Sequence, residues 1–220
     1  TEALIETEVA VRELERGGVL AALHEEAVPE LAAYEGNAIH DPEGRVRAAG
    51  QVRASVRRGL RVLRNTVGFA AMVPAVGSNL VECLPDARGV EDVAGVPGRV
   101  VDVKGRPTVP ADPEFGVSEH VAGVLLAARA AGADVRGAVN VRYDPSFVDA
   151  LSAAGLTATA FDSEADREGD RSAVERALSD RPVGERFALY QAGAVGVEPI
   201  LYVLGPDAPA VARTVRDHLA

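Results

Sequence analysis

The sequence predicts an α/β layered domain that follows a helical N-terminal region. From residue 68 onward, short apolar segments typical of strands alternate with segments of helical period and with Gly/Pro turns. Residues 1–67 lack this alternation and carry apolar residues at steps of three or four. A composition of 47% hydrophobic and 25% charged residues is that of an ordinary globular protein. We therefore divide the chain into a helical region, 1–67, and a ligand-binding domain, 68–220.

The last helix of the N-terminal region has the clearest limits. Asp41-Pro42-Glu43 favours a helix start, because Asp is a good N-cap and Pro suits the first helical position. Gly68 is expected to end this helix. Residues 1–35 hold nine acidic residues and two arginines, whereas residues 41–66 hold seven arginines and two acidic residues. The arginines could face phosphate groups or DNA, but pairing with the acidic half or plain solvation is favoured.

Ten elements are expected after residue 68. The predicted strands are Leu80–Leu84, Val100–Val103, Ala138–Val141, Leu156–Phe161, Phe187–Tyr190 and Ile200–Leu204. The predicted helices are Glu119–Ala131, Pro145–Ala154, Arg171–Ser179 and Pro206–Leu219.

Composition and charge exclude several classes of protein. A net charge of −10 argues against nonspecific nucleic-acid binding. Arginine supplies all but one of the 23 basic residues, a pattern that either a halophilic protein or a genome rich in G and C would show. There is no apolar run of membrane-spanning length and no signal peptide. The single cysteine and the scattered histidines lack metal-ligand spacing. We expect a cytoplasmic protein without metal or cofactor.

Polar residues interrupt apolar segments at two turns that lead into predicted strands. Ser78 and Asn79 follow Gly77 at the mouth of one strand, where they could bind a ligand or form an ordinary polar turn. Arg99 follows Pro97-Gly98 just inside the next strand. A buried arginine needs a partner, which could be a carboxylate of the protein or a phosphate of a ligand.

A predicted helix start supplies a further candidate site. Ser118 is a natural N-cap, so the first backbone N–H groups of the helix should point outward around Gly116 and form an anion site. His120 lies in the first turn, where it is either structural or an acid–base group.

Two further segments could line a pocket. Asn140 and Arg142 share one face of a strand, which is either a pocket wall or the solvated face of an edge strand. The loop that contains Gly193, Gly196 and Glu198 could wrap a ligand or merely turn.

Taken together and in order, these segments resemble the ThiN family of thiamine-phosphate synthases, over about residues 70–215. The matching pieces are Gly77-Ser78-Asn79-Leu80, residues 93–99, Phe-Gly-x-Ser-x-His at 115–120, Asn-Val-Arg at 140–142, Phe-Asp at 161–162 and Gly-x-x-Gly-x-Glu at 193–198. The resemblance implies a three-layer αβα fold similar to class II aldolase-like domains. It also implies a pocket for thiamine phosphate or for its phosphorylated pyrimidine and thiazole precursors, in which Arg99 and His120 match the catalytic residues.

The sequence departs from the enzyme pattern at two basic positions. Ser163 stands where active relatives usually carry an arginine, and Val197 stands where they carry a lysine. The Asp-Arg pair before Gly193 is also missing, since Gln191-Ala192 occupies it. Fewer cations beside a phosphate site should weaken the stabilisation of departing pyrophosphate. We therefore expect negligible turnover.

Residues 4–15 resemble the connecting helix of archaeal regulators in which a helix-turn-helix precedes a ThiN-like domain. We accordingly expect the effector domain of a thiamine-responsive repressor, homodimeric, that binds thiamine or its phosphate esters and contacts DNA through a module outside this chain. The alternative is an active thiamine-phosphate synthase. The predicted ligand-binding residues are Ser78, Asn79, Arg99, Gly116, Ser118, His120, Asn140, Arg142, Gly193, Gly196 and Glu198.

Overall fold

The computed structural model describes residues 44–161, 170–179, 184–193 and 198–219. The chain divides into two compact units, Thr1–Ala54 and Ser55–Ala220. In the first unit the described residues are 44–54, which include the beginning of helix α3 (Arg45–Arg64). The helices predicted within residues 1–43, including the proposed Asp41 cap, lie outside the described residues.

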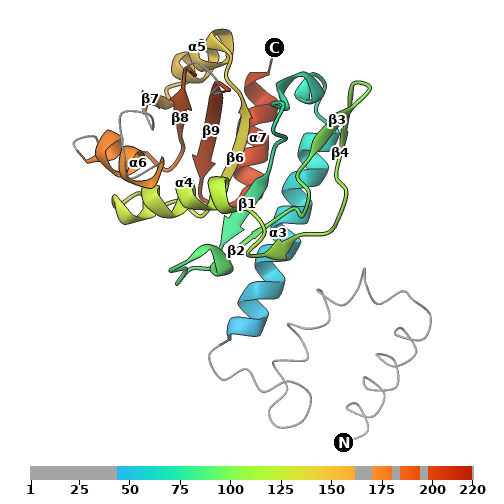
Figure 1. Cartoon of the computed structure of the whole chain (residues 1–220), viewed down its shortest axis with the longest axis vertical. Helices are drawn as coiled ribbons and strands as arrows, with labels where there is room; N and C mark the ends of the chain where they lie inside the picture. Colours follow the sequence, from blue (N-terminus) through green and yellow to red (C-terminus); the bar gives the residue numbers. More distant parts are fainter. Residues whose placement is uncertain (1–43, 162–169, 180–183, 194–197, 220) are drawn as a thin grey trace, which may run out of the picture. The chain divides into compact units, whose positions relative to one another are not determined.

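Seven strands of the second unit form one mixed sheet (Figure 1). Their order across the sheet is β5-β2-β1-β6-β9-β8-β7. Neighbouring strands are antiparallel except β7 and β8, which are parallel and are connected through helix α6. The strands are β1 (Leu80–Cys83), β2 (Val93–Gly95), β5 (Glu114–Phe115), β6 (Gly137–Arg142), β7 (Thr157–Ala160), β8 (Phe187–Gln191) and β9 (Ile200–Gly205).

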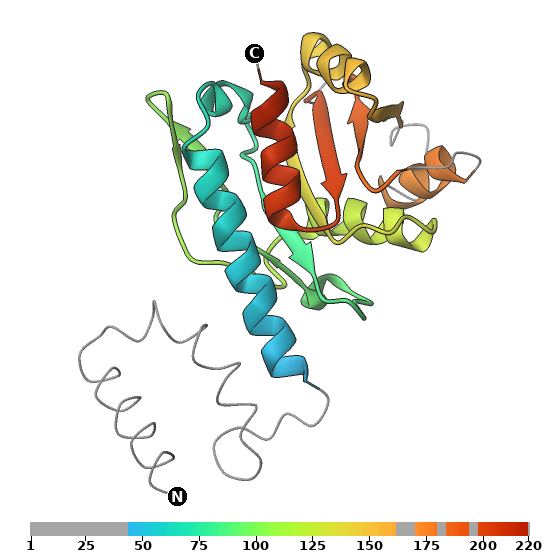
Figure 2. The same cartoon turned by 180° about the vertical axis from the view of Figure 1, so that it is seen from behind.

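Helices cover both faces of this sheet, so the predicted layered α/β architecture is confirmed. Helices α4 (Glu119–Ala130) and α6 (Asp170–Leu178) pack against each other on one face (Figure 1). Helix α7 (Ala208–His218) lies on the other face against β6, β9 and β1, and α5 (Pro145–Ala153) contacts α7 and β7 (Figure 2). All four predicted helices of this domain are present, each within two residues of its expected limits. None of the helices in the described ranges has the length and hydropathy of a membrane span.

Side chains that alternate along the central strands fill the two interfaces between sheet and helices. Val81 and Cys83 of β1 belong to the buried cluster that α4 and α6 cover, together with Leu125. Burial raises the pKa of the Cys83 thiol. At the start of β6, a Cβ on Gly137 would lie 2.6 Å from the carbonyl carbon of Asp207. Glycine at this position therefore allows the chain to approach closely where α7 begins.

A buried carboxylate joins three elements near this contact. The side chain of Glu82 is 2% exposed and accepts a hydrogen bond of 2.6 Å from Nη2 of Arg136. Its other oxygen accepts a hydrogen bond of 2.9 Å from the backbone N–H of Ala208, at the beginning of α7. Glu82 therefore links β1, the segment before β6, and the N-terminus of α7.

One predicted strand is present but does not belong to the main sheet. Val101–Val103 forms β3, which pairs with β4 (Arg106–Thr108) in a separate two-stranded ribbon. Val101 and Val103 are 38% and 47% exposed, so this short apolar segment does not enter the core. The ribbon turns at Lys104 and Gly105, and the Gly105 N–H donates to Oδ1 of Asp102 at 2.7 Å.

The helix that precedes the domain ends earlier than predicted. Helix α3 stops at Arg64 rather than at Gly68. Gly68, with φ 85°, instead precedes a short 3-10 helix, η1 (Phe69–Met72). A second 3-10 helix, η2 (Val90–Asp92), leads into β2. Of the predicted arginine row, Arg57 pairs with Asp112 at 3.3 Å.

The start of α5 gives a testable prediction about helix capping. Asp144 accepts hydrogen bonds from the hydroxyl and the backbone N–H of Ser146, at 2.7 and 2.8 Å, and these bonds lower the pKa of its carboxyl group. We expect Asp144→Ala to lower the free energy of unfolding by about 1 kcal/mol at pH 7, as loss of an N-cap does. Chemical denaturation measures this change.

The pH dependence of this cap follows from the direction of the pKa change. A carboxyl group whose pKa is lower in the folded state stabilises above its unfolded value, 3.8, and that stabilisation is lost as pH falls through the folded value. Asp144→Asn keeps a capping oxygen but cannot ionise. The stability difference between wild type and Asp144→Asn should therefore decline below pH 4, whereas a constant difference down to pH 2 would contradict this account.

Candidate functional site

A cavity of about 690 Å³ lies in the second unit at the N-terminal end of α4 and is bordered by β6, β8 and β9. Seven of the eleven predicted ligand-binding residues line it: Asn79, Arg99, Gly116, Ser118, His120, Asn140 and Glu198. Residues far apart in the sequence therefore converge on a single cavity. A volume of this size lies within the range of about 300–1,000 Å³ that is usual for small-molecule sites.

Four predicted residues are not placed in the cavity wall. Ser78 is fully buried, and its backbone forms two hydrogen bonds with Val100. Arg142 and Gly193 are exposed and do not line the cavity. Gly196 lies outside the described residues, as do the departures from the family pattern at Ser163 and Val197. Arg142 shares one face of β6 with Asn140, but it lies at the exposed end of the strand and outside the cavity lining.

Two buried asparagines connect the strands and turns that line the cavity. The side chain of Asn140 accepts a hydrogen bond of 2.6 Å from the N–H of Asn79 and donates one of 2.9 Å to the carbonyl of Gly77. The side chain of Asn79 in turn forms two hydrogen bonds with the backbone of Val96, at 2.8 and 2.9 Å. Each side-chain amide thus bonds to backbone groups next to the strand ends, where the neighbouring strand supplies no backbone partner. Strand β6 lies in the middle of the sheet, so the edge-strand interpretation of Asn140 is wrong.

Arg99 lies in a turn, whereas the sequence had predicted a position just inside a strand. Its N–H donates to the carbonyl of Val96 at 3.1 Å, and Gly98 has φ 73°, which is the pattern of a type II turn with Pro97 at its second position. Arg99 itself has φ 63°, a left-handed conformation that costs a residue with a side chain about 1–2 kcal/mol.

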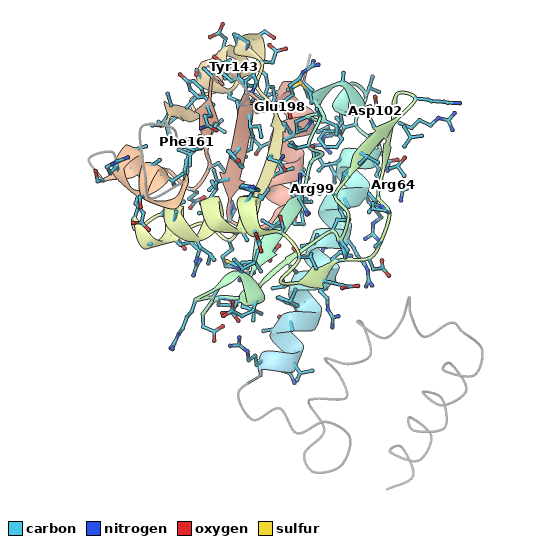
Figure 3. All side chains as sticks on the ribbon, viewed as in Figure 1. Arg64, Arg99, Asp102, Tyr143, Phe161 and Glu198 are labelled. Carbon is cyan, nitrogen blue, oxygen red and sulfur yellow. The ribbon has the colours of Figure 1, made fainter. Side chains whose placement is uncertain are left out.

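The guanidinium of Arg99 has a partner of a kind that the sequence did not suggest. Its Nη1 donates to the backbone carbonyl of Val76. Figure 3 labels Arg99. Within the part of the chain that the structure describes, no carboxylate pairs with it, and it does not lie in a strand. The remaining N–H donors of the exposed guanidinium are therefore available to an anion in the cavity.

Helix α4 begins at the cavity. Ser118 occupies the N-cap position, but its side chain forms no capping hydrogen bond. The first N–H groups of an α-helix have no carbonyl partner within the helix. The first-turn residues Glu119, His120 and Val121 line the cavity, so these N–H groups and the helix dipole favour a bound anion there.

Glu198 lines the cavity, and its carboxylate is bound to the backbone. Its two carboxylate oxygens accept hydrogen bonds from the N–H groups of Ala75 and Val76, at 2.6 and 3.2 Å. The turn that contains these residues closes with a bond of 2.8 Å from the Gly77 N–H to the Pro74 carbonyl.

Several lining residues were not predicted, chiefly on the strands across from Asn140. Ile200 and Tyr202 of β9 pair with Arg142 and Asn140 of β6, so they share the face of the sheet on which Asn140 lies. Gln191 at the end of β8 pairs with Ile200. Alternation along the strand could have placed Ile200 and Tyr202 on one face, but only the strand register shows that this face borders the cavity.

The chemistry of the cavity is mixed. Arg99 and the α4 N-terminus favour an anionic group, whereas Val121, Ile200 and Tyr202 supply apolar and aromatic contacts. Among the residues that the structure describes, no three His, Cys, Asp or Glu side chains are grouped as metal ligands. Fold and cavity together define an α/β domain whose site suits a ligand with both an anionic and a ring portion.

Comparisons with known proteins identify the family. Residues 55–217 match the family described as thiamine-phosphate synthase ThiN, so the chain belongs to the ThiN family. The thiamine-phosphate synthase ThiN of Methanothermobacter thermautotrophicus is 32% identical over 169 residues, which are 72% of this chain and 87% of that protein. The bifunctional thiamine biosynthesis protein ThiDN of Methanocaldococcus jannaschii is 32% identical over 148 residues, 66% of this chain and 35% of that protein.

A solved structure supports the fold. The C-terminal domain of a phosphomethylpyrimidine kinase superposes with a TM-score of 0.68 at 23% identity, covering 77% of this chain and 98% of that one. These comparisons overturn the main functional prediction from the sequence. The relatives are named as biosynthetic enzymes, and the prediction of a repressor's effector domain is wrong. It gave more weight to missing cations at Ser163 and Val197 than to Arg99 and His120, which share the cavity.

Proposed function

We propose that this chain is an active thiamine-phosphate synthase, which joins hydroxymethylpyrimidine diphosphate to thiazole phosphate. The observation that carries the proposal is the convergence of Arg99, His120 and the α4 N-terminus on one cavity. Such a site can stabilise the charge that develops on a departing pyrophosphate. Membership of the ThiN family, shown by a match over residues 55–217, supports the choice of these substrates.

The reaction needs one bond to break and one to form. The bond between the methylene carbon of the pyrimidine and the diphosphate oxygen breaks, and the electron pair leaves with pyrophosphate. The ring nitrogen of the thiazole phosphate supplies the electron pair for the new carbon–nitrogen bond. Donors aimed at the departing oxygens lower the barrier most, because the charge on those oxygens grows in the transition state.

We assign the roles by position in the cavity. Arg99 and the first-turn N–H groups of α4 would bind the diphosphate, and His120, in the same turn, would protonate or orient the departing group. The apolar wall formed by Ile200 and the buried Tyr202 would receive the rings. Binding of thiamine phosphate esters follows from the same arrangement, since the product contains both the rings and a phosphate.

A direct test of this proposal is the condensation assay. Purified protein would be mixed with hydroxymethylpyrimidine diphosphate and thiazole phosphate, and thiamine phosphate would be quantified by chromatography in high and in low salt. We expect the turnover rate of an ordinary enzyme, on the order of 1–10³ per second. Pyrophosphate should be released in an amount equal to the thiamine phosphate formed. Absence of product at substrate concentrations that saturate binding by calorimetry would refute the proposal.

Homodimerisation stays a prediction, which sedimentation velocity of the whole chain would test. The reason first given for it, the two-fold symmetry of a repressor on its operator, no longer applies once the repressor prediction is dropped.

A further inference from the structure

We propose that Glu198 is a positioning residue, which holds Arg99 in its working orientation through the backbone of Val76. The sequence predicted Glu198 as a direct ligand contact. The structure instead binds both of its carboxylate oxygens to backbone N–H groups of the turn at residues 74–77. The catalytic meaning of this inference rests on the proposed synthase function, but the anchoring itself does not.

The contacts form a continuous series from the carboxylate to the guanidinium. Oε2 of Glu198 accepts from the N–H of Val76 at 3.2 Å, and Oε1 accepts from the N–H of Ala75 at 2.6 Å. The carbonyl of the same Val76 accepts from Nη1 of Arg99. Val76 is therefore held at its N–H by Glu198 and accepts from Arg99 at its carbonyl. Figure 3 labels Glu198 and Arg99.

Gly77 holds the stem of Arg99 on this turn. A Cβ on Gly77 would lie 3.1 Å from Cβ and 3.3 Å from Cδ of Arg99, so the arginine stem lies directly against the backbone there. Gly77 has φ 81°, and Asn140 donates to its carbonyl at 2.9 Å. The turn at residues 74–77 is thus a support whose position decides where the Arg99 side chain can lie.

Arg99 has particular need of such a support. It is exposed, and its backbone is in the left-handed region, so neither core packing nor strand pairing restricts its side chain. An arginine that is free to change rotamer loses conformational entropy when it binds an anion. A guanidinium already held on a carbonyl loses less, which is the advantage of a pre-organised donor.

Charge argues against a direct contact between Glu198 and a phosphate. A carboxylate beside the anion site repels a diphosphate, unless its charge is offset by other groups. The two backbone N–H groups offset part of that charge. The carboxylate oxygens that accept these hydrogen bonds are occupied by the turn and not by the ligand.

A double-mutant cycle on the whole chain separates the two roles. The probe is inorganic pyrophosphate, whose Kd is measured by calorimetry for wild type, Glu198→Ala, Arg99→Ala and the double variant. We expect Glu198→Ala to weaken binding about tenfold, the size of one impaired charge-assisted contact. In the Arg99→Ala background the same change should have almost no further effect, because its only route to the anion is gone. A further tenfold loss in that background overturns the proposal.

Two further variants serve as a conservative replacement and a matched control for the cycle. Glu198→Gln retains one carbonyl oxygen for a backbone N–H and should bind pyrophosphate within about threefold of wild type. If the alanine variant does not fold, Glu198→Ser, which also removes both carboxylate oxygens, replaces it in the cycle. Asp144→Ala is the matched control, since it removes another carboxylate bound to a backbone N–H, outside the cavity lining. It should lower stability and leave the Kd unchanged.

The outcomes distinguish this inference from the proposed function. A non-additive cycle on pyrophosphate supports positioning even if the condensation assay shows no product. Condensation with an additive cycle retains the synthase and overturns positioning. If the wild-type protein fails to bind pyrophosphate at all, Arg99 has no anion to hold and the positioning inference fails.

Discussion

Replacing Arg99 with alanine is expected to lower kcat/KM for the condensation by about 10²–10³-fold, the loss that follows removal of one donor from a site of developing charge. Among the described residues Arg99 is the one arginine in the cavity lining, and in the proposed mechanism its donors bind the departing pyrophosphate. Arg99→Lys should recover only part of this loss, because an ammonium group cannot form a forked pair with phosphate oxygens. Steady-state kinetics on all three proteins measures the effect.

The backbone at Arg99 adds a second expected result. Because glycine adopts φ 63° without strain, Arg99→Gly should raise the free energy of unfolding relative to Arg99→Ala by about 1 kcal/mol, with activity equally low in both.

Arg106→Ala, on the exposed ribbon and outside the cavity lining, is the matched control for loss of an arginine in the activity measurement. An Arg99→Ala variant with kcat/KM within threefold of wild type would remove Arg99 from the mechanism.

Replacing Arg136 with alanine is expected to lower the free energy of unfolding by about 3 kcal/mol, because it leaves the carboxylate of Glu82 buried without its cation. The value lies at the low end for such pairs, since the Arg136 side chain is 34% exposed and Glu82 keeps the N–H of Ala208. Urea denaturation measures the loss.

Two variants check the cause of that loss. Arg129→Ala also removes an arginine, one that donates to the carbonyls of Val135 and Pro85 at 2.8 Å and forms no ion pair with a buried carboxylate among residues 44–161, 170–179, 184–193 and 198–219. It should cost less than Arg136→Ala. Adding Glu82→Gln to Arg136→Ala should recover part of the stability by removing the unpaired charge. If the two arginine variants lose equal stability, the buried carboxylate is not the reason.

Local patterns in the sequence were sufficient for most elements of the domain. The predicted helix starts at Pro145 and Pro206 lie at and two residues before the observed starts of α5 and α7, because capping and periodicity are local signals. Strand β3 was predicted, but a short segment such as Val-Asp-Val does not show whether it pairs within the main sheet or in a separate ribbon. Strand β2 was missed because it is three residues long and coincides with a Gly/Pro-containing motif.

The candidate site was predictable where its residues lie in recognisable turns and not where it depends on register. Arg99, Ser118 and His120 were found from a Pro-Gly turn and a helix start, and the structure brings them to one cavity. Tyr202 and Gln191 could not be found this way, because their approach to Asn140 depends on long-range pairing of β6, β9 and β8. The role of Glu198 also needed coordinates, since its partners Ala75 and Val76 are more than a hundred residues away.

The ribbon formed by β3 and β4 carries a residue that can be used for chemical coupling. Lys104 at its turn is exposed and is the sole lysine among the 220 residues. Amine-reactive reagents will therefore modify one side chain besides the α-amino terminus, and that side chain does not line the cavity. Once the α-amino group has been blocked, coupling through Lys104 would attach every molecule to a sensor surface through the same residue. The buried Cys83 would stay unreactive toward thiol reagents that are used to label an introduced surface cysteine.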